Sequence, residues 1–471
     1  MVDLLRKVTA ELIRTVLISG RPAHEAVSYA PMKTALAAAL FLALPALTSA
    51  QTSSREAITF GKDVAPILQR SCQSCHNPGG IGPMSLITYE QVRPWARAIK
   101  AKTSKREMPP WFIEKNIGIQ QFKDDISLSD REIDLVSRWV DAGAPQGNPT
   151  DLPTPAQRPR GADWTIGTPD LVVSSPVLNV KPVAADFMTD IGPTPVGLAE
   201  DRYVQAIEVR EVARGKAEPA GSRSLNYFLV HHATITITDA RESSREVEPG
   251  DEGSGRRLVF YQMGQNPTTY PADVGALLPA GSALKFGVHV HSVGEALPLK
   301  LEVALKFYPK GVTPKYVLTP FSASPRFQHE ELDLPAGESN IRVDGYTPVT
   351  RPMKLVTYVP HLHANGTRMC IEAVYPDGRN EMLNCSRWDH NWSRQYFYED
   401  DAAPLLPAGT QIHVIAWFDN SAGNPRNIEP RNWKGYGNRT IDDMSFLLSE
   451  AIYLTDDQFK AEVAARAART R

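Results

Sequence analysis

Two cysteines and a histidine form the first group of residues whose spacing indicates chemistry, in Cys72-Gln73-Ser74-Cys75-His76. In a Cys-x-x-Cys-His motif the two thiols form thioethers with haem, and the adjacent imidazole binds the iron. The alternative, a structural disulfide or half of a zinc site, is weaker because no second Cys-x-x-Cys completes a zinc site. The sequence therefore predicts one covalent haem c on Cys72 and Cys75, with His76 as an axial ligand.

The second axial ligand of the iron is expected from the same segment of the chain, residues 51–143. His76 is the only histidine there, so the thioethers of Met84 and Met108 are the candidates. Met108 precedes Pro109-Pro110, whose fixed φ angles would hold it at small entropic cost. We predict Met108 as the ligand, with Met84 as the alternative.

Six histidines in the C-terminal part form three close pairs: His231 with His232, His289 with His291, and His361 with His363. Residues i and i+2 of a strand share a face, so the second and third pairs could each chelate a metal. Adjacent residues of a regular strand point to opposite faces, so a common metal at the first pair needs a bulge or a strand end. One pair alone would equally suit hydrogen-bonded histidines; three in order indicate metal ligands.

The order of these motifs resembles the type II copper, ascorbate-dependent monooxygenases, which include peptidylglycine hydroxylating and dopamine beta-monooxygenases. That family binds copper in two jelly-roll domains, through an adjacent histidine pair and a later histidine, and then through His-x-His and a methionine. The matching residues here are His231, His232 and His289 for an electron-transfer copper, and His361, His363 and Met444 for a catalytic, oxygen-binding copper. A thioether ligand suits Cu(I) and would not select zinc.

The segments Tyr375–Gly378, Trp388–Trp392 and Phe418–Ser421 are similar to a bacterial branch in which a cytochrome c domain is fused to this unit. The resemblance implies a monooxygenase that acts on O2 and a small organic substrate and receives electrons through the haem, with a periplasmic donor. Val359 stands where the peptide-amidating members have a substrate-binding arginine, which leaves the substrate open. His291, His390 and His413 are expected to be non-ligands.

The same residues are compatible with two other functions. One is a non-catalytic electron-transfer or binding protein whose sandwich domains contain no copper. The other is copper storage or delivery without hydroxylation. Nucleic acid is not an expected partner, because 51 Lys+Arg against 53 Asp+Glu provide no basic field.

The N-terminal region has the pattern of a signal peptide. Met32-Lys33 precedes an apolar run, Ala35–Leu47, which is too short to span a membrane, and Thr48-Ser49-Ala50 forms a small-residue cleavage site. We expect a periplasmic or secreted protein with no membrane span after cleavage. Residues 1–31 are expected to be an N-terminal extension that precedes the natural start.

Helix and strand signals divide the remaining chain of 471 residues. Thr88 with Gln91 and Ser129 with Glu132 have the spacing of capping boxes, whereas apolar residues alternate with period two after the proline-rich stretch. We predict an all-α cytochrome c domain followed by two antiparallel β-sandwich, jelly-roll domains. The expected boundaries are a signal peptide at 32–50, the cytochrome domain at 51–143, a linker at 144–170, copper domains at 171–312 and 313–456, and a tail at 457–471. The linker predicts that a chain starting near Asp163 folds without the haem domain.

Cys370 and Cys385 are expected to form a disulfide. If Asp377-Gly378 are the turn residues of a two-residue hairpin, residues whose numbers sum to 755 face each other, as these two do. This register makes them a hydrogen-bonded pair with α-carbons roughly 5.5 Å apart.

Overall fold

A computed structural model describes most of the chain from Ala57 onward: residues 57–78, 82–155, 164–213, 229–239, 256–262, 267–271, 273–324, 332–437, 439 and 441–469. The predicted signal peptide and N-terminal extension lie outside the described residues. No helix among the described residues is long and apolar enough to cross a membrane.

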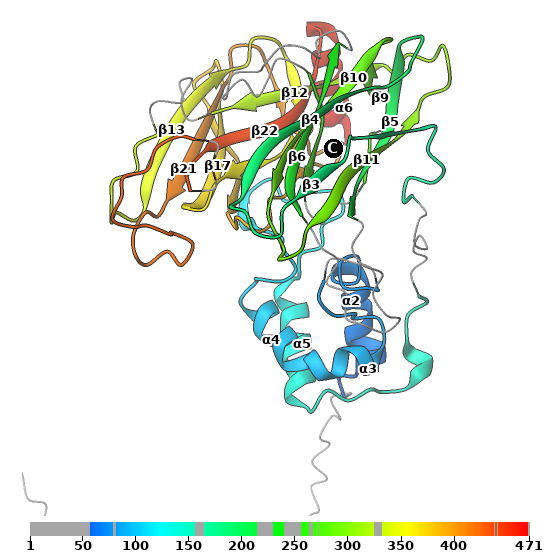
Figure 1. Cartoon of the computed structure of the whole chain (residues 1–471), viewed down its shortest axis with the longest axis vertical. Coiled ribbons are helices and arrows are strands. Elements are labelled where there is room, and N and C mark those ends of the chain that lie inside the picture. Colours follow the sequence, from blue (N-terminus) through cyan, green and yellow to red (C-terminus); the bar gives the residue numbers. More distant parts are fainter. Residues whose placement is uncertain are drawn as a thin grey trace, which may run out of the picture. The chain divides into compact units, whose positions relative to one another are not determined.

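Four short helices in the N-terminal part of the described chain, drawn in blue and cyan in Figure 1, share one apolar core. They are α2 (Ala65–Ser71), α3 (Tyr89–Val92), α4 (Ala96–Ser104) and α5 (Asp130–Asp141), with single π or 3-10 turns at Phe60–Val64, Arg93–Trp95 and Pro149–Asp151. Both predicted capping boxes are confirmed: the Thr88 and Ser129 side chains each accept a backbone N–H three residues on, and Gln91 and Glu132 complete them. A further helix, α6 (Asp456–Arg469), follows the last strand.

Three large sheets contain most of the strands. The five-stranded sheet has the order β1 (Ile113–Gly118), β18 (Asn380–Arg387), β17 (Gly366–Val374), β21 (Gln411–Phe418) and β13 (Ile341–Pro348). The four-stranded sheet has the order β4 (Phe187–Pro195), β10 (Ser282–Val290), β6 (Val230–Asp239) and β7 (Arg256–Gln262). The eleven-stranded sheet has the main path β2 (Leu171–Ser174), β11 (Leu297–Phe307), β5 (Arg202–Ala213), β9 (Val274–Leu278), β12 (Tyr316–Ala323), β22 (Ser445–Tyr453), β14 (Met353–Leu355) and β20 (Leu405–Leu406).

The remaining short strands pair along the eleven-stranded sheet or with each other. They are β3 (Leu178–Val180) beside β11, β8 (Thr268–Thr269) beside β5, β16 (Pro360–Leu362) beside β22, and β15 (Thr357–Tyr358) paired with β19 (Tyr396–Phe397).

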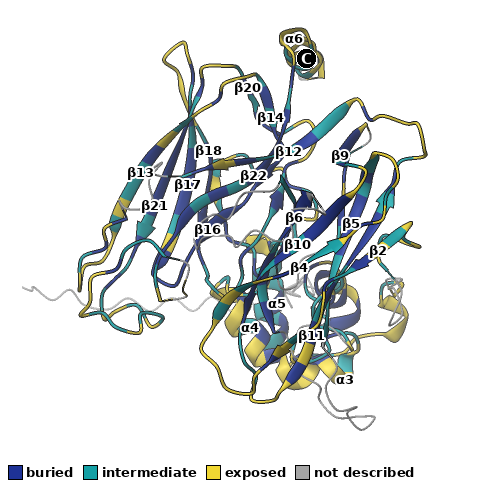
Figure 2. Ribbon diagram, turned by 45° about the horizontal axis from the view of Figure 1, so that its top comes forward, coloured by how far each residue is buried: buried dark blue, intermediate teal, exposed yellow. Residues whose placement is uncertain are grey.

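The eleven-stranded sheet is shared by two β-sandwiches. Its first part packs on the four-stranded sheet to form the first sandwich, and its second part packs on the five-stranded sheet to form the second; the buried strands are dark blue in Figure 2. The parts join where β12 pairs in parallel with β9, between Tyr316 and Val274. The half-buried Arg257 of the first sandwich also donates to the Ser449 carbonyl of the second, at 2.6 Å. The predicted division at residues 312 and 313 falls in the connection between β11 and β12.

The prediction of an all-α cytochrome c domain at residues 51–143 is wrong, and the two predicted sandwiches share one sheet. Between α4 and α5 the chain forms β1, which pairs with β18, and the buried Ile113 and Phe122 belong to the core of the second sandwich. The capping boxes on both sides predicted helices correctly but carried no information on this stretch. Its own strand signal is short, because only Ile117 and Ile119 continue the alternation that begins at Ile113.

The helical segment is therefore attached to the sandwiches by more than its linker. Glu114 of β1 forms a bidentate ion pair with Arg368, whose guanidinium donates two hydrogen bonds of 2.7 and 2.8 Å to the carboxylate. Phe122 stacks on Tyr398 with ring centroids 5.0 Å apart. A chain starting near Asp163 would lose all of these contacts, so we expect it to be less stable than the full chain.

The predicted disulfide between Cys370 and Cys385 is confirmed, and the two residues are register partners in β17 and β18. The predicted hairpin differs in detail. Tyr375 donates to the Arg379 carbonyl, so the turn has three residues, and a bulge between Ile371 and Glu372 restores the predicted register at the cysteines. The α-carbons are 4.0 Å apart, which is closer than a hydrogen-bonded pair allows and fits a non-hydrogen-bonded pair.

Candidate metal centre

The three histidines of the predicted first copper site lie on two paired strands, β6 and β10, at one end of the four-stranded sheet. His232 on β6 is the partner of His289 on β10, but the next partners are Val230 and Val290. His231 is therefore the extra residue of a β-bulge. This bulge, at the beginning of the strand, is the feature that allows two adjacent histidines to turn toward the same side.

Their nitrogen atoms have the spacing of metal ligands. Nδ1 of His231 is 3.1 Å from Nδ1 of His232, and one ligand atom from each of His231, His232 and His289 lies within 4.8 Å of the others. With metal–nitrogen bonds of about 2.0 Å, a separation of 3.1 Å corresponds to an N–metal–N angle of roughly 100°. The three imidazoles therefore fit one metal ion.

The residues of the predicted second copper site lie at the end of β16 and just before β22, in the second sandwich. The antiparallel register pairs His361 with Phe446 and Leu362 with Ser445; extended by one residue, it places Met444 across from His363. Nδ1 of His363 donates to the Asp442 carbonyl at 3.1 Å. This hydrogen bond fixes the tautomer in which Nε2 of His363 can bind a metal.

Asp443 holds the two chain segments of this set together. Its carboxylate is fully buried and accepts a hydrogen bond from the side-chain amide of Asn365 at 2.8 Å. Burial raises the pKa of Asp443 to about 7. Since Asn365 follows His363 by two residues and Asp443 precedes Met444, this contact positions both predicted ligands.

The imidazoles of the two predicted copper sites, together with that of His390, form a closed circle of neighbouring side chains. Ring centroids are 5.3 Å apart for His232 and His361, and 5.5 Å for His361 and His363. They are 6.2 Å apart for His363 and His390, and 4.8 Å for His390 and His231. The structure therefore brings the predicted copper sets of the two sandwiches into direct contact.

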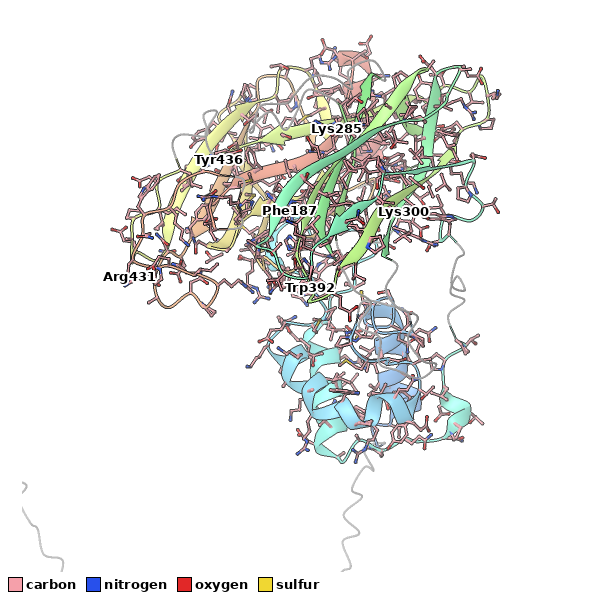
Figure 3. All side chains as sticks on the ribbon, viewed as in Figure 1. Phe187, Lys285, Lys300, Trp392, Arg431 and Tyr436 are labelled. Carbon is pink, nitrogen blue, oxygen red and sulfur yellow. A yellow bond between two sulfur atoms is a disulfide. The ribbon has the colours of Figure 1, made fainter. Side chains whose placement is uncertain are left out.

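His390 was expected to be a non-ligand, yet its imidazole is part of this circle of neighbouring histidines. It lies in the loop after β18, whose Trp392 is labelled in Figure 3. Its backbone carbonyl accepts a 2.6 Å hydrogen bond from Nε2 of His231. The sequence contained no pairing signal for it, because it is an isolated histidine between two tryptophans.

The buried imidazoles are held in the neutral form that binds metals. Burial, followed by the neighbouring histidines, lowers the pKa of His232 and His361 well below the ordinary value of 6.5. The same causes lower the pKa of His289 to about 3, and burial lowers that of His363 to about 4. Metal binding here therefore requires little displacement of protons near neutral pH.

The other histidines lie elsewhere or outside the described residues. His413 is held between Glu372 and Asp344, at 3.0 and 2.8 Å. The backbone N–H of His291 donates to the Leu229 carbonyl, just beyond β10. His329 and His24 lie outside the described residues.

The predicted haem residues follow α2 directly. The backbone N–H groups of Cys75 and His76 both donate to the Cys72 carbonyl, so the motif is a tight turn, and both cysteines are free thiols. Nδ1 of His76 donates to the Met84 carbonyl at 3.2 Å, which leaves Nε2 for iron. A Cβ on Gly82 would lie 2.4 Å from the His76 ring, so a residue without a side chain is required there.

The two candidate methionines lie in different surroundings. The Met84 backbone lies on the Nδ1 side of His76, opposite the nitrogen that would bind iron, and its side chain packs against the helical core. Met108 is half-buried just after α4, in the segment that leads to β1. Met108 therefore stays the predicted distal ligand.

Comparisons with known proteins add little to this description. No protein-family model and no curated protein matches the chain. A solved structure of the major capsid protein P2 from bacteriophage PM2 is similar over 60% of this chain and 99% of that chain, with 8% identity and a TM-score of 0.26. A structure of PNGF-II is similar over 60% and 65%, with 9% identity and a TM-score of 0.21. TM-scores this low carry no argument.

Proposed function

We propose that this chain is an exported copper monooxygenase that hydroxylates an organic substrate with O2 and receives its electrons through a covalently bound haem c. The observation that carries the proposal is the convergence of His231, His232 and His289 with His361 and His363 from the other sandwich. The Nδ1 atoms of His361 and His390, which are buried and have no hydrogen-bond partner, also fit a metal site.

Each set of residues has its own task in this proposal. His231, His232 and His289 would hold the copper that stores an electron, and His361, His363 and Met444 the copper at which O2 reacts. Copper there would supply one-electron redox chemistry and a coordination position for O2. The chain itself keeps the imidazoles neutral by burial, fixes His363 through Asp442, and positions Met444 through Asp443.

The haem residues fit their proposed role in the same way. Burial raises the pKa of the Cys72 thiol to about 12, so the free thiol is protonated near neutral pH. Burial lowers the pKa of His76, which keeps its imidazole neutral as an iron ligand requires. Val359, between β15 and β16, has a buried and uncharged side chain, so this position offers no cation to a substrate carboxylate.

Metal analysis followed by haem kinetics tests the proposal. Iron and copper are measured on the purified full chain, and the reduced haem is then mixed with O2 in copper-loaded and copper-free protein. We expect one iron and two copper ions per chain, and much faster haem reoxidation when copper and substrate are present. Haem without copper uptake would support the non-catalytic electron-transfer alternative, and copper without O2 consumption would support storage or delivery.

Met444→Ala provides the residue-level test. It should abolish O2 consumption and leave the haem spectrum unchanged, since the haem residues lie in a separate segment. Met382→Ala is the matched control, because the Met382 sulfur lies beside the disulfide, 3.8 Å from Sγ of Cys385. Full activity without Met444 would remove the oxygen-site assignment.

A further inference from the structure

A glutamate from the opposite sheet of the first sandwich holds the chain just before His231. Glu211 lies on β5 of the eleven-stranded sheet, and its carboxylate accepts the backbone N–H groups of Leu229 and Val230, at 2.6 and 3.1 Å. Val230 is the first residue of β6, in the four-stranded sheet, and His231 follows it. The contact therefore joins the two facing sheets directly beside the bulge that carries His231.

This pair of hydrogen bonds requires a bent backbone. Successive N–H groups of an extended strand point to opposite edges of the strand, so the two oxygens of one carboxylate can accept both only where the chain turns. The carbonyl of Leu229 is held as well, by the backbone N–H of His291. Glu211 and the end of β10 together therefore fix the direction in which the chain enters the bulge.

The ring of His231 is held at a second point. Its Nε2 donates to the His390 carbonyl at 2.6 Å, which leaves Nδ1 to bind a metal. That Nδ1 lies 3.1 Å from Nδ1 of His232, so a displacement of the backbone at His231 would change the N–metal–N angle. The contact of Glu211 opposes such a displacement.

We propose that Glu211 is a positioning residue for the metal held by the three-histidine site, His231, His232 and His289. Its carboxylate fixes the backbone at Val230 and so sets the place of the His231 imidazole relative to the other two. The inference rests on the proposed function only for the identity of the metal as copper. It goes further by assigning a role at this site to a residue of the opposite sheet.

Glu211→Gln tests this role with a change of one atom. A side-chain amide has a single acceptor oxygen, so one of the two backbone N–H groups would face the amide NH2 in place of an acceptor. Glu208→Gln is the matched control, because Glu208 lies three residues away on β5 and therefore on its other face. One Glu208 oxygen accepts the Thr165 N–H at 2.6 Å and the other accepts from Arg210 at 2.9 Å. Each variant thus deprives one donor of its acceptor, and only Glu211 lies beside the three-histidine site.

Cu(II) alone is the probe, added to the full chain in a His363→Ala background, which removes a predicted ligand of the other copper. Competition with a chelator measures affinity at pH 8, above the pKa of about 7 to which burial raises that of Glu211. Electron paramagnetic resonance reports the ligand geometry, and urea unfolding of copper-free protein reports stability. We expect Glu211→Gln to weaken copper binding roughly tenfold and to change the copper hyperfine splitting, and Glu208→Gln to do neither.

Equal affinities and equal spectra in the two variants would overturn the positioning role. If Glu211→Gln does not fold, Glu211→Asp takes its place; it keeps both acceptor oxygens on a side chain one methylene shorter and should change the spectrum while Glu208→Asp does not. A parent chain that takes up no copper at the three-histidine site would overturn this inference together with the proposed function. Copper binding as expected in a wild-type chain that consumes no O2 would refute the proposed function alone and leave the role of Glu211 standing.

Discussion

The indole N–H of Trp388 donates a hydrogen bond to the backbone carbonyl of His363, at 3.0 Å. The Trp388 ring lies edge-on to His361, with centroids 6.1 Å apart. Its neighbour Arg387 donates through its backbone to the Phe112 carbonyl and through its side chain to the Arg106 carbonyl. Residues 387 and 388 therefore link the segment around Met108 with the predicted catalytic histidines.

Trp388→Phe should weaken copper binding at the His361–His363 set. The variant keeps an aromatic ring and loses one hydrogen bond, which is worth about 1 kcal/mol, or roughly fivefold in copper affinity. Competition titration with a copper chelator measures the change. Trp433→Phe is the control, since the Trp433 indole is 61% exposed and bonds to Asp333. Equal copper affinity in both variants would contradict the positioning role of Trp388.

Met108→Ala should leave the haem covalently attached but change its low-spin spectrum and lower its reduction potential, because a thioether ligand favours ferrous iron. Met84→Ala is the matched control and should leave the spectrum unchanged, since the Met84 backbone lies behind the proximal imidazole. Visible spectroscopy and potentiometry measure both. The reverse result, an altered spectrum only in Met84→Ala, would assign the distal ligand to Met84.

Glu211 should make the fold less stable as the pH rises from acidic to neutral. Its carboxylate accepts the backbone N–H groups of Leu229 and Val230, at 2.6 and 3.1 Å, and burial raises its pKa from 4.5 to about 7. Between these pH values the folded chain keeps a proton that the unfolded chain has lost, so stability falls with pH by on the order of 3 kcal/mol. Tyr261 beside it does not titrate in this range, because burial and the Glu211 charge raise its pKa.

Urea unfolding of copper-free protein at several pH values measures this slope. Glu211→Gln removes the titrating group, so the variant should lose this component of the pH dependence. A slope that is identical in wild type and variant would show that Glu211 is not protonated in the fold.

Phe122→Ala should destabilise the second sandwich although Phe122 lies within the predicted haem domain. Phe122 is 5% exposed and packs against Tyr398, Tyr396 and Trp111. Loss of a buried phenylalanine costs about 3–5 kcal/mol, which chemical denaturation measures. Ile428→Ala, at a residue 73% exposed, is the control and should change stability very little. An equally small effect of Phe122→Ala would mean that this segment does not pack on the sandwich.

Local patterns in the sequence were sufficient for features whose causes lie within a few residues. The capping boxes at Thr88 and Ser129 depend on a side chain and a backbone group three residues apart, and both were predicted. The disulfide was found from hairpin register, although the bulge between Ile371 and Glu372 changed the turn that produced it. The two strands of a hairpin are close in sequence, so their pairing still depends mainly on local residues.

Only the tertiary structure decided how distant segments meet. The sequence predicted that His231 and His232 need a bulge to share a metal, but the bulge itself results from pairing with His289, nearly sixty residues away in the chain. The pairing of β1 with β18 and the contact of His390 with His231 join residues more than 150 positions apart. Such contacts depend on burial shared between whole sheets, so no spacing or periodicity along the chain encodes them.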